Sequence, residues 1–477
     1  MNASCLKTLV LVGGLAASFS AMAQGTLRDG RANALCLYSH TLADDPIVHP
    51  KRPGTAMRHD FFGNTAADAY TTGASLLAKS DTTCENAADS SSYWAPSLKL
   101  ADGTIVPPTY KKTYYQNVAV PSSNRYPVSV MPTGLQMLAG NHAGTGPNPR
   151  ISFLCTGSRK GYTNTIPTDC VPDPVKGTQL NIGISFPTCW DGMNLSPTLR
   201  SHHGGYNNMA YADKNGACPD GYPVRVPHLS INLAYALGQV RDLTHAQLSK
   251  DPTEDAFGNV SHENWGSLYS GHADFFNGWQ PKAMRYLTEQ CLNKERVCAR
   301  EIPYDYYPPE DDTTVSGGDG VHTTSGRDVK LVAEAAQGAT PPRSFYMMFQ
   351  IPEGARALPA RFKPEYKIMI HGGNVSSTAA NVLQVFVTDS AWNEDTMTMT
   401  NAPACGGRYV ARLNLNHVMQ YRYIDVSSAV ANAIADGKQT ISFCVKAVRP
   451  GNTFEFSSKE GPYSPMLILR AIKQLPF

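Results

Sequence analysis

The hydrophobic pattern changes along this 477-residue chain, and its last third alternates between apolar and polar positions. Alternation puts successive side chains on opposite faces of an extended backbone, so each alternating run predicts a strand. Six such runs occur, at 344–350, 366–371, 382–388, 408–415, 440–445 and 466–472. A helical pattern covers only 426–435 and ends at Gly437. The pattern predicts a jelly-roll-like β-sandwich as the C-terminal domain.

The preceding part has no sustained period and is rich in Gly, Pro, Ser and Asn loops. We expect helices at 230–248 and at 281–292, where Pro281 suits a first helical turn. Short strands are expected at 117–120, 151–155 and 180–186. The N-terminal domain is therefore predicted to be mostly β, with irregular loops and a few helices (α+β).

A Pro- and acid-rich segment without periodicity, 302–314, separates the two patterns. Since 477 residues exceed what one core fills comfortably, we interpret this segment as a linker. It divides a domain at 24–301 from one at 315–477.

The first 23 residues have the pattern of a secretory signal peptide. Lys7 precedes an apolar run over 8–21, and Ala21-Met22-Ala23 offers small residues for cleavage. The run is too short to span a bilayer, and no later stretch approaches the ~20 apolar residues that a membrane helix needs. We expect a secreted, extracellular or periplasmic protein without membrane insertion.

The cysteine count agrees with an oxidising compartment. Of 11 Cys, Cys5 lies in the signal segment, which leaves an even number for disulfides. The sequence leaves connectivity open; our expectation is pairing of neighbours, as Cys36–Cys84, Cys155–Cys170, Cys189–Cys218, Cys291–Cys298 and Cys405–Cys444. No Cys-x-x-Cys pair occurs, which disfavours a cysteine metal site.

The charge balance limits the partners. A formal charge of +2 disfavours a nucleic-acid surface, and only 17% charged residues with 39 Gly and 34 Pro are typical of an extracellular β-rich protein. We expect a monomer that binds no nucleic acid.

Three polar, aromatic-rich signatures carry the candidate chemistry, at 186–192, 201–203 and 271–279. His272 and Asp274 are two residues apart, so on a strand both side chains project to one face. His202 is preferred over His203, because adjacent side chains of an extended chain point in opposite directions.

Two chemical interpretations remain open. His59, His202, His272 and Asp274 could hold a divalent metal ion. Alternatively, Asp191 and Asp274 could be the acid and base of a glycoside hydrolase, with Trp190 and Trp279 stacking on sugar. Structural roles compete with both: a buried His bonded to main chain, and an Asx turn at Asp191.

Residues 44–300 resemble the secreted domain-of-unknown-function family nineteen-ninety-six. The matching motifs are 45–48, 59–64, 82–84, 93–96, 137–140, 186–192, 201–202, 218–224 and 272–279. Trp94 and Asn277 lie in these motifs, which makes them candidate substrate-binding residues beside Trp190 and Trp279. The first block departs from the family pattern, since Arg58-His59 supplies one His where the family has two.

Residues 311–477 resemble the DNRLRE-type β-sandwich, similar to family-ninety-six carbohydrate-binding modules. The motifs are 392–396, 401–403, 423–426 and 456–460. This resemblance implies attachment to polysaccharide. Trp392 is a stacking candidate, although anchoring of the core is the favoured role, and Tyr421, Arg422 and Tyr423 are alternatives.

The sequence has no Gly-x-Ser-x-Gly, P-loop, Rossmann or His-Glu-x-x-His motif. Our leading hypothesis is a secreted polysaccharide-active protein, with a glycoside hydrolase favoured. The alternatives are a non-catalytic glycan-binding adhesin or matrix protein and a metal-dependent oxidoreductase acting on glycan. The candidate catalytic residues are His59, Asp191, His202, His272 and Asp274, with a possible divalent metal ion as the cofactor.

Overall fold

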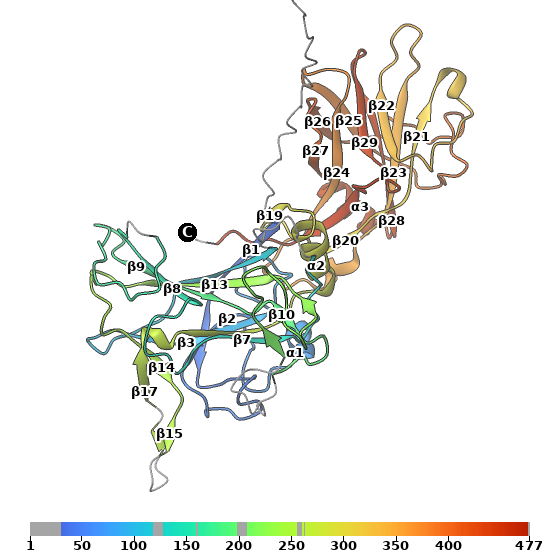
Figure 1. Cartoon of the computed structure of the whole chain (residues 1–477). Coiled ribbons are helices and arrows are strands. Elements are labelled where there is room, and N and C mark those ends of the chain that lie inside the picture. The colour runs from blue at the N-terminus through green and yellow to red at the C-terminus, as the bar shows by residue number, and fades with distance from the viewer. Residues whose placement is uncertain are drawn as a thin grey trace, which may run out of the picture.

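The structure is a computed structural model that describes residues 30–117, 127–158, 161–197, 208–254, 260–261 and 263–475. It is mostly β and has two sheet-rich parts, one blue to yellow-green and one yellow to red in Figure 1. The expected fold class is confirmed.

The N-terminal part is built on a large sheet in the order β7-β18-β3-β2-β1-β6-β13-β9-β8. These strands are β1 (Gly30–Leu42), β2 (His59–Gly63), β3 (Ser92–Pro96), β6 (Tyr110–Asn117), β7 (Gln136–Gly140), β8 (Ile151–Cys155), β9 (Gln179–Ser185), β13 (His228–Ala236) and β18 (His272–Phe276). The long strand β1 joins two halves of this sheet. It pairs with β6 over residues 30–37 and with β2 over residues 38–42. A short strand, β19 (Val297–Ala299), pairs with the start of β1 in parallel.

The half-sheet β2-β3-β18-β7 is covered on both faces, which explains why nearly all its residues are buried. Its inner face contributes Phe62, Tyr93 and Phe275 to the main core. Its outer face carries a separate cluster of apolar side chains, made by Ile47, Phe61, Ala67, Leu76, Trp94, Leu138 and Phe276. Leu76 belongs to the short helix α1 (Gly73–Ala78), which Thr72 caps. The strand alternation therefore defines an outer face that lies beneath the loop 44–57 and α1.

Three small sheets complete this part, in the orders β11-β10-β12, β17-β14-β4-β5 and β15-β16. Their strands are β4 (Leu98–Lys99), β5 (Ile105–Val106), β10 (Cys189–Trp190), β11 (Met209–Ala210), β12 (Val224–Arg225), β14 (Gln247–Lys250), β15 (Thr253–Glu254), β16 (Val260–Ser261) and β17 (Asn264–Ser267). A 3-10 turn, Leu268–Ser270, leads into β18.

The predicted helix at 281–292 is confirmed as α2 (Pro281–Tyr286) and a π-helical turn, Leu287–Leu292. The predicted helix at 230–248 is wrong, because this segment forms most of β13 and the start of β14. Leu229, Ile231 and Leu233 are buried while Ser230 and Asn232 are half-buried, which is the period of a strand. The predicted strands at 151–155 and 180–186 are confirmed, whereas most of 117–120 lies outside the described residues.

The C-terminal part is a sheet in the order β20-β30-β24-β29-β22-β23-β28-β25-β26, with β21 paired to β23 and β27 to β24. The strands are β20 (Asp305–Tyr307), β21 (Pro309–Ser316), β22 (Lys330–Glu334), β23 (Arg343–Gln350), β24 (Glu365–Asn374), β25 (Asn381–Thr388), β26 (Arg408–Leu415), β27 (Gln420–Asp425), β28 (Thr440–Ala447), β29 (Thr453–Ser457) and β30 (Met466–Arg470). All six predicted strands are present, and the predicted helix is α3 (Ser427–Ala435). Two 3-10 turns, Gly318–Gly320 and Glu353–Ala357, lie in the loops.

Most of 302–314, the segment interpreted as a linker, forms paired strands. Residues 305–307 pair with β30, and residues 309–316 pair with β23. The acidic residues Asp311 and Asp312 therefore belong to a strand of the C-terminal sheet, and hydrogen bonding in the ladder offsets their low strand propensity.

The two parts contact each other through main chain and side chains. Ala87 N–H donates to Ala471 O (2.9 Å), and Lys473 N–H donates to Glu85 O (2.7 Å). The Arg296 guanidinium lies 3.9 Å from the centre of the Tyr421 ring.

All five expected disulfides are present, with the neighbour pairing described above. Within the ranges that the structure describes, no helix is long and apolar enough to cross a bilayer.

Candidate functional site

Two rows of side chains cross the outer face of the half-sheet β2-β3-β18-β7. One row follows the register Phe61, Trp94, Asp274 and Leu138; the next follows His59, Pro96, His272 and Gly140. Because residues two apart on a strand share a face, His272 and Asp274 project together, as the sequence predicted. The register places His59 and His272 on either side of β3, with their ring centres 6.0 Å apart.

A cavity of about 270 Å³ lies over this face. Its lining residues are Asp45, Val48, Met57, Leu138, Ala139, Gly140, His142, Asp251, His272 and Asp274. Gly140 is required at its position: φ is +98°, and a Cβ there would lie 2.5 Å from His272 Cα. Close approach of β7 to β18 at this glycine brings the cavity wall against His272.

Main-chain carbonyls orient both imidazoles. His59 Nδ1 lies 2.9 Å from Asp44 O, and His272 Nδ1 lies 3.0 Å from Ser270 O. A carbonyl oxygen only accepts a hydrogen bond, so each Nδ1 carries the proton and each Nε2 keeps a lone pair. His59 Nε2 is buried and has no hydrogen-bond partner among the described residues. Donor atoms of His59, His272 and Asp274 all lie within 4.8 Å of one another.

The electrostatics of this cluster reflect burial. Burial raises the pKa of Asp274 well above its ordinary value, and the charges of Asp45 and Asp251 raise it further. The Trp94 indole N–H faces the same carboxyl, outside the geometry of a full hydrogen bond, and lowers the pKa. Burial lowers the pKa of His272 to about 4 and also lowers that of His59.

The loop over the cavity is held by carboxylates. Asp44 accepts hydrogen bonds from Gly54 N–H and Ala69 N–H, at 2.8 and 3.0 Å. Asp45 Oδ1 accepts from Ile47 N–H and Val48 N–H, both at 2.8 Å. These bonds fix the loop that supplies both the Asp44 carbonyl and the Asp45 carboxylate.

A second loop brings Asp251 to the wall of the cavity. It follows β14, and its Oδ1 accepts a hydrogen bond from Met57 N–H (3.2 Å). Asp251 therefore links the two loops while it lines the cavity.

Asp191, another predicted catalytic residue, is not part of this cluster. Asp191 forms the Asx turn that was the competing interpretation: its Oδ1 accepts from Met193 N–H and Asn194 N–H, both at 2.9 Å. Trp190 belongs to the same turn, since its indole N–H donates to Asn194 O (2.7 Å). His202 lies outside the described residues.

Two of the predicted substrate-binding residues are in the interior. Trp279 is 1% exposed and donates its indole N–H to Tyr115 Oη (2.9 Å). Asn277 donates to Met131 O and Pro132 O. Neither side chain can stack on or bind a sugar at the surface, so the prediction for these two is wrong. Trp94 is also buried, beneath the cavity, where it packs on Phe61 with ring centres 5.5 Å apart.

Asp45, His142 and Asp251 line the cavity although they were not among the predicted site residues. Asp45 had a signal, because it opens the 45–48 motif of the family resemblance. Asp251 had none: it is an ordinary Asp-Pro loop residue, and only the fold brings it to His272.

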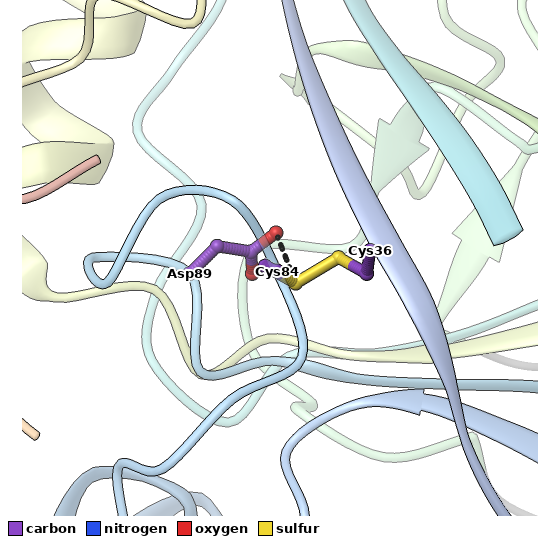
Figure 2. A group of neighbouring side chains, drawn as sticks. All are labelled: Cys36, Cys84 and Asp89. Atoms are coloured by element: carbon purple, nitrogen blue, oxygen red, sulfur yellow. Dashed lines mark hydrogen bonds between the residues drawn. A yellow bond between two sulfur atoms is a disulfide. The ribbon is translucent and has the colours of Figure 1, made fainter. Parts of the chain in front are cut away.

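A second group with metal-ligand side chains, Cys36, Cys84 and Asp89, has another explanation. Figure 2 shows that the two sulfur atoms form a disulfide, with Asp89 beside it. Cys84 Sγ lies 3.5 Å from Asp89 Oδ2. Disulfide sulfurs are not thiolate ligands, so this group is structural.

In the C-terminal part, Trp392 anchors the core, as favoured. It donates its indole N–H to Ser442 Oγ (3.2 Å) and packs edge-on against Tyr346.

Family comparisons match both parts of the chain. The model of the domain of unknown function DUF1996 matches residues 45–279, and that of carbohydrate-binding module family 96 (CBM96) matches residues 303–471. The chain is similar to DUF1996 proteins over its N-terminal part and to CBM96 modules over its C-terminal part. The resemblances to family nineteen-ninety-six and to family-ninety-six modules are thereby confirmed, and the cavity lies in the part that matches DUF1996.

The remaining comparisons add little. No curated protein matches the chain. Among solved structures, a glycoside hydrolase family 43 arabinoxylan arabinofuranohydrolase from Bacillus subtilis is 10% identical, with 90% of this chain and 68% of that chain covered, at a TM-score of 0.16. An exo-β-1,3-galactanase from Phanerochaete chrysosporium is 8% identical, with 80% and 93% covered, at a TM-score of 0.14. TM-scores this low support no conclusion about fold or function.

Proposed function

We propose that this chain is an extracellular polysaccharide-active hydrolase, whose CBM96 module holds glycan and whose DUF1996 domain cleaves it in the cavity over β18. The observation that carries this proposal is the cavity itself. Three carboxylates and two imidazoles line its wall, a concentration of acid, base and ligand groups that substrate-cleaving sites need.

The surroundings of the cavity support a catalytic role over a purely structural one. Buried ionisable groups are costly to desolvate, and proteins retain them mainly where they form ion pairs or take part in function. Here Asp45, Asp251 and Asp274 lie close enough for the charges of the first two to raise the pKa of the third, because like charges repel one another. Such an arrangement lowers the stability of the fold. We propose that the chain retains it because these carboxylates take part in catalysis.

The compartment is consistent with a glycan substrate. Five disulfides stabilise the described residues, which is typical of proteins outside the reducing cytosol. The match to a carbohydrate-binding module supports delivery to an extracellular polysaccharide.

In the proposed reaction, Asp45 or Asp251 accepts a proton from the attacking water, because both carboxylates line the cavity from its covering loops. The water oxygen bonds to the anomeric carbon, the glycosidic C–O bond breaks, and the leaving oxygen takes up a proton from solvent, to which the base later returns the proton that it accepted. Bond formation and cleavage balance without an oxidant or reductant.

The test is release of reducing ends from a panel of extracellular glycans that the protein binds in pull-down. Wild type is expected to release product, and Asp45→Asn or Asp251→Asn to lower kcat/KM at least ~100-fold for the residue acting as the base. Binding to insoluble glycan stays unchanged in both variants, because the CBM96 module is intact. Asp220→Asn, an exposed carboxylate, is the matched control and keeps wild-type activity.

Glycan binding without product from any bound polysaccharide would overturn the hydrolase and leave a non-catalytic adhesin. Wild-type activity in both cavity variants would instead show that cleavage takes place elsewhere.

A further inference from the structure

His59, His272 and Asp274 bring two imidazole nitrogens and a carboxylate oxygen together on the outer face of β2 and β18. We propose that these three side chains form a site for a divalent transition-metal ion, with zinc as the best fit. Binding of the ion stands on this geometry alone; its part in glycan cleavage rests on the proposed function.

The orientation of the imidazoles carries the argument. Metal-ligating histidines commonly donate their second ring N–H to a carbonyl or carboxylate, which fixes the tautomer and leaves the other nitrogen free to ligate. Both His59 and His272 have this arrangement, through Asp44 O and Ser270 O. The Asp44 side chain is in turn bonded to two backbone N–H groups, so the support for His59 is rigid.

His59 Nε2 gives an independent reason. The His59 side chain is 1% exposed, and this nitrogen has no hydrogen-bond partner in the described part of the chain. Leaving a buried polar atom without a partner destabilises the folded state. An ion shared with His272 and Asp274 supplies the missing partner.

The spacing suits a small ion. Ligand bonds of about 2.0–2.1 Å in a tetrahedral site set donor atoms roughly 3.4 Å apart. The three donors already lie within 4.8 Å of one another, so side-chain shifts of about 1 Å complete the site. The register of two strands holds their backbones, with β3 between them.

The ligand types select the ion. Imidazole nitrogen suits zinc, copper, iron and nickel, whereas calcium and magnesium prefer sites made of oxygen alone. Three protein ligands leave a fourth position open toward the cavity, which is typical of catalytic zinc and not of structural zinc.

The open position gives the ion a place in the proposed hydrolysis. A bound divalent ion lowers the pKa of a water ligand toward neutrality. Asp45 and Asp251 line the same cavity and accept the proton that this water loses.

The test is metal binding by the full chain, made without a histidine tag and stripped with a chelator. Isothermal titration with zinc chloride and elemental analysis are expected to show one ion per chain in wild type. His272→Ala, His59→Gln and Asp274→Asn are each expected to weaken binding at least ~10-fold. His245→Ala, an exposed histidine away from the cavity, is the matched control and binds as wild type.

Cobalt absorption and thermal unfolding are two further measurements of metal binding by the folded protein. Cobalt is expected to give visible absorption bands in wild type and His245→Ala that are lost in His272→Ala. Zinc is expected to raise the Tm of wild type and not that of the three ligand variants, each first shown to be folded by circular dichroism.

No stoichiometric binding by wild type, or wild-type binding by His272→Ala, would overturn the site. Zinc binding by wild type, together with full glycan cleavage by the metal-stripped protein, would confirm the site and overturn only its part in catalysis.

Discussion

At the residue scale, Asp312 shows how burial makes a carboxyl sensitive to pH. The side chain is 1% exposed; its Oδ2 accepts a hydrogen bond from Lys459 N–H (2.8 Å), and its Oδ1 has no partner among the described residues. Burial raises the pKa of Asp312 to about 7, and the charges of Glu460 and Glu394 add to this.

Asp312→Asn is therefore expected to change how stability depends on pH. Between about pH 4 and 7 the folded chain holds a proton on Asp312 that the unfolded chain releases, so wild-type stability falls as pH rises. Asn stays neutral and keeps an oxygen for Lys459 N–H. The difference in free energy of unfolding should shift in favour of the variant by at most about 4 kcal/mol between pH 4 and 8.

Urea unfolding at pH 4, 6 and 8 measures this difference. Asp319→Asn removes an exposed carboxylate and should run parallel to wild type. If the free energy of unfolding of Asp312→Asn also followed the pH dependence of wild type, the assigned pKa shift would be contradicted.

The sequence predicted single residues well where local pattern decides their direction. The shared face of His272 and Asp274 follows from strand period alone. Trp279 and Asp251 show the limit: an indole in a Gly- and Asn-rich motif has the same local pattern in a core or in a pocket, and Asp251 meets His272 only through loop packing.

At the element scale, each of the five disulfides joins two cysteines that follow one another in the mature sequence. The chain-entropy argument predicts unequal contributions, because longer loops lose more freedom when closed. Cys405–Cys444 spans 39 residues and Cys291–Cys298 spans 7.

Replacing Cys405 and Cys444 together by Ala is expected to lower the free energy of unfolding by about 4 kcal/mol, against about 2 kcal/mol for Cys291 and Cys298. Urea unfolding of both double variants measures the contrast. Equal losses would show that native packing around the sulfur atoms outweighs loop length.

Helices were predicted less reliably than strands. At 281–292, Pro281 indicated a first helical turn, and the segment is helical. The segment 230–248 instead contains most of a strand, a loop and the start of another short strand. The alternation of apolar and polar residues at Leu229, Ser230 and Ile231 was the correct signal for a strand. The helix prediction instead took Ser230 as a helix cap, but Ser230 pairs with a residue of β9 in the sheet.

At the scale of the whole molecule, the sequence predicted two sheet-rich parts but not their contact. Tyr286 Oη donates to Met369 Sδ (3.1 Å), and Arg296 lies against Tyr421 while it donates to Tyr423 Oη (3.4 Å). Side chains from distant segments make these contacts, so no local pattern reveals them.

Arg296→Ala should weaken the coupling between the two parts by about 1–2 kcal/mol, because a cation–π contact and hydrogen bonds are lost together. Scanning calorimetry is expected to show a broader unfolding endotherm, or two separate ones, compared with wild type. Arg285→Ala, which removes an exposed pair with Glu289, is the control and keeps the wild-type profile. Identical thermograms for the two variants would show that Arg296 does not couple the parts.

The pairing of β1 has a consequence for how the chain matures. Synthesis delivers β1 before any of its partners, and the last of them, β19, ends at Ala299. The sheet therefore cannot be completed until the ribosome has passed that residue. Until then the start of β1 keeps an unpaired backbone edge where β19 will lie, which makes the nascent chain a substrate for holding chaperones.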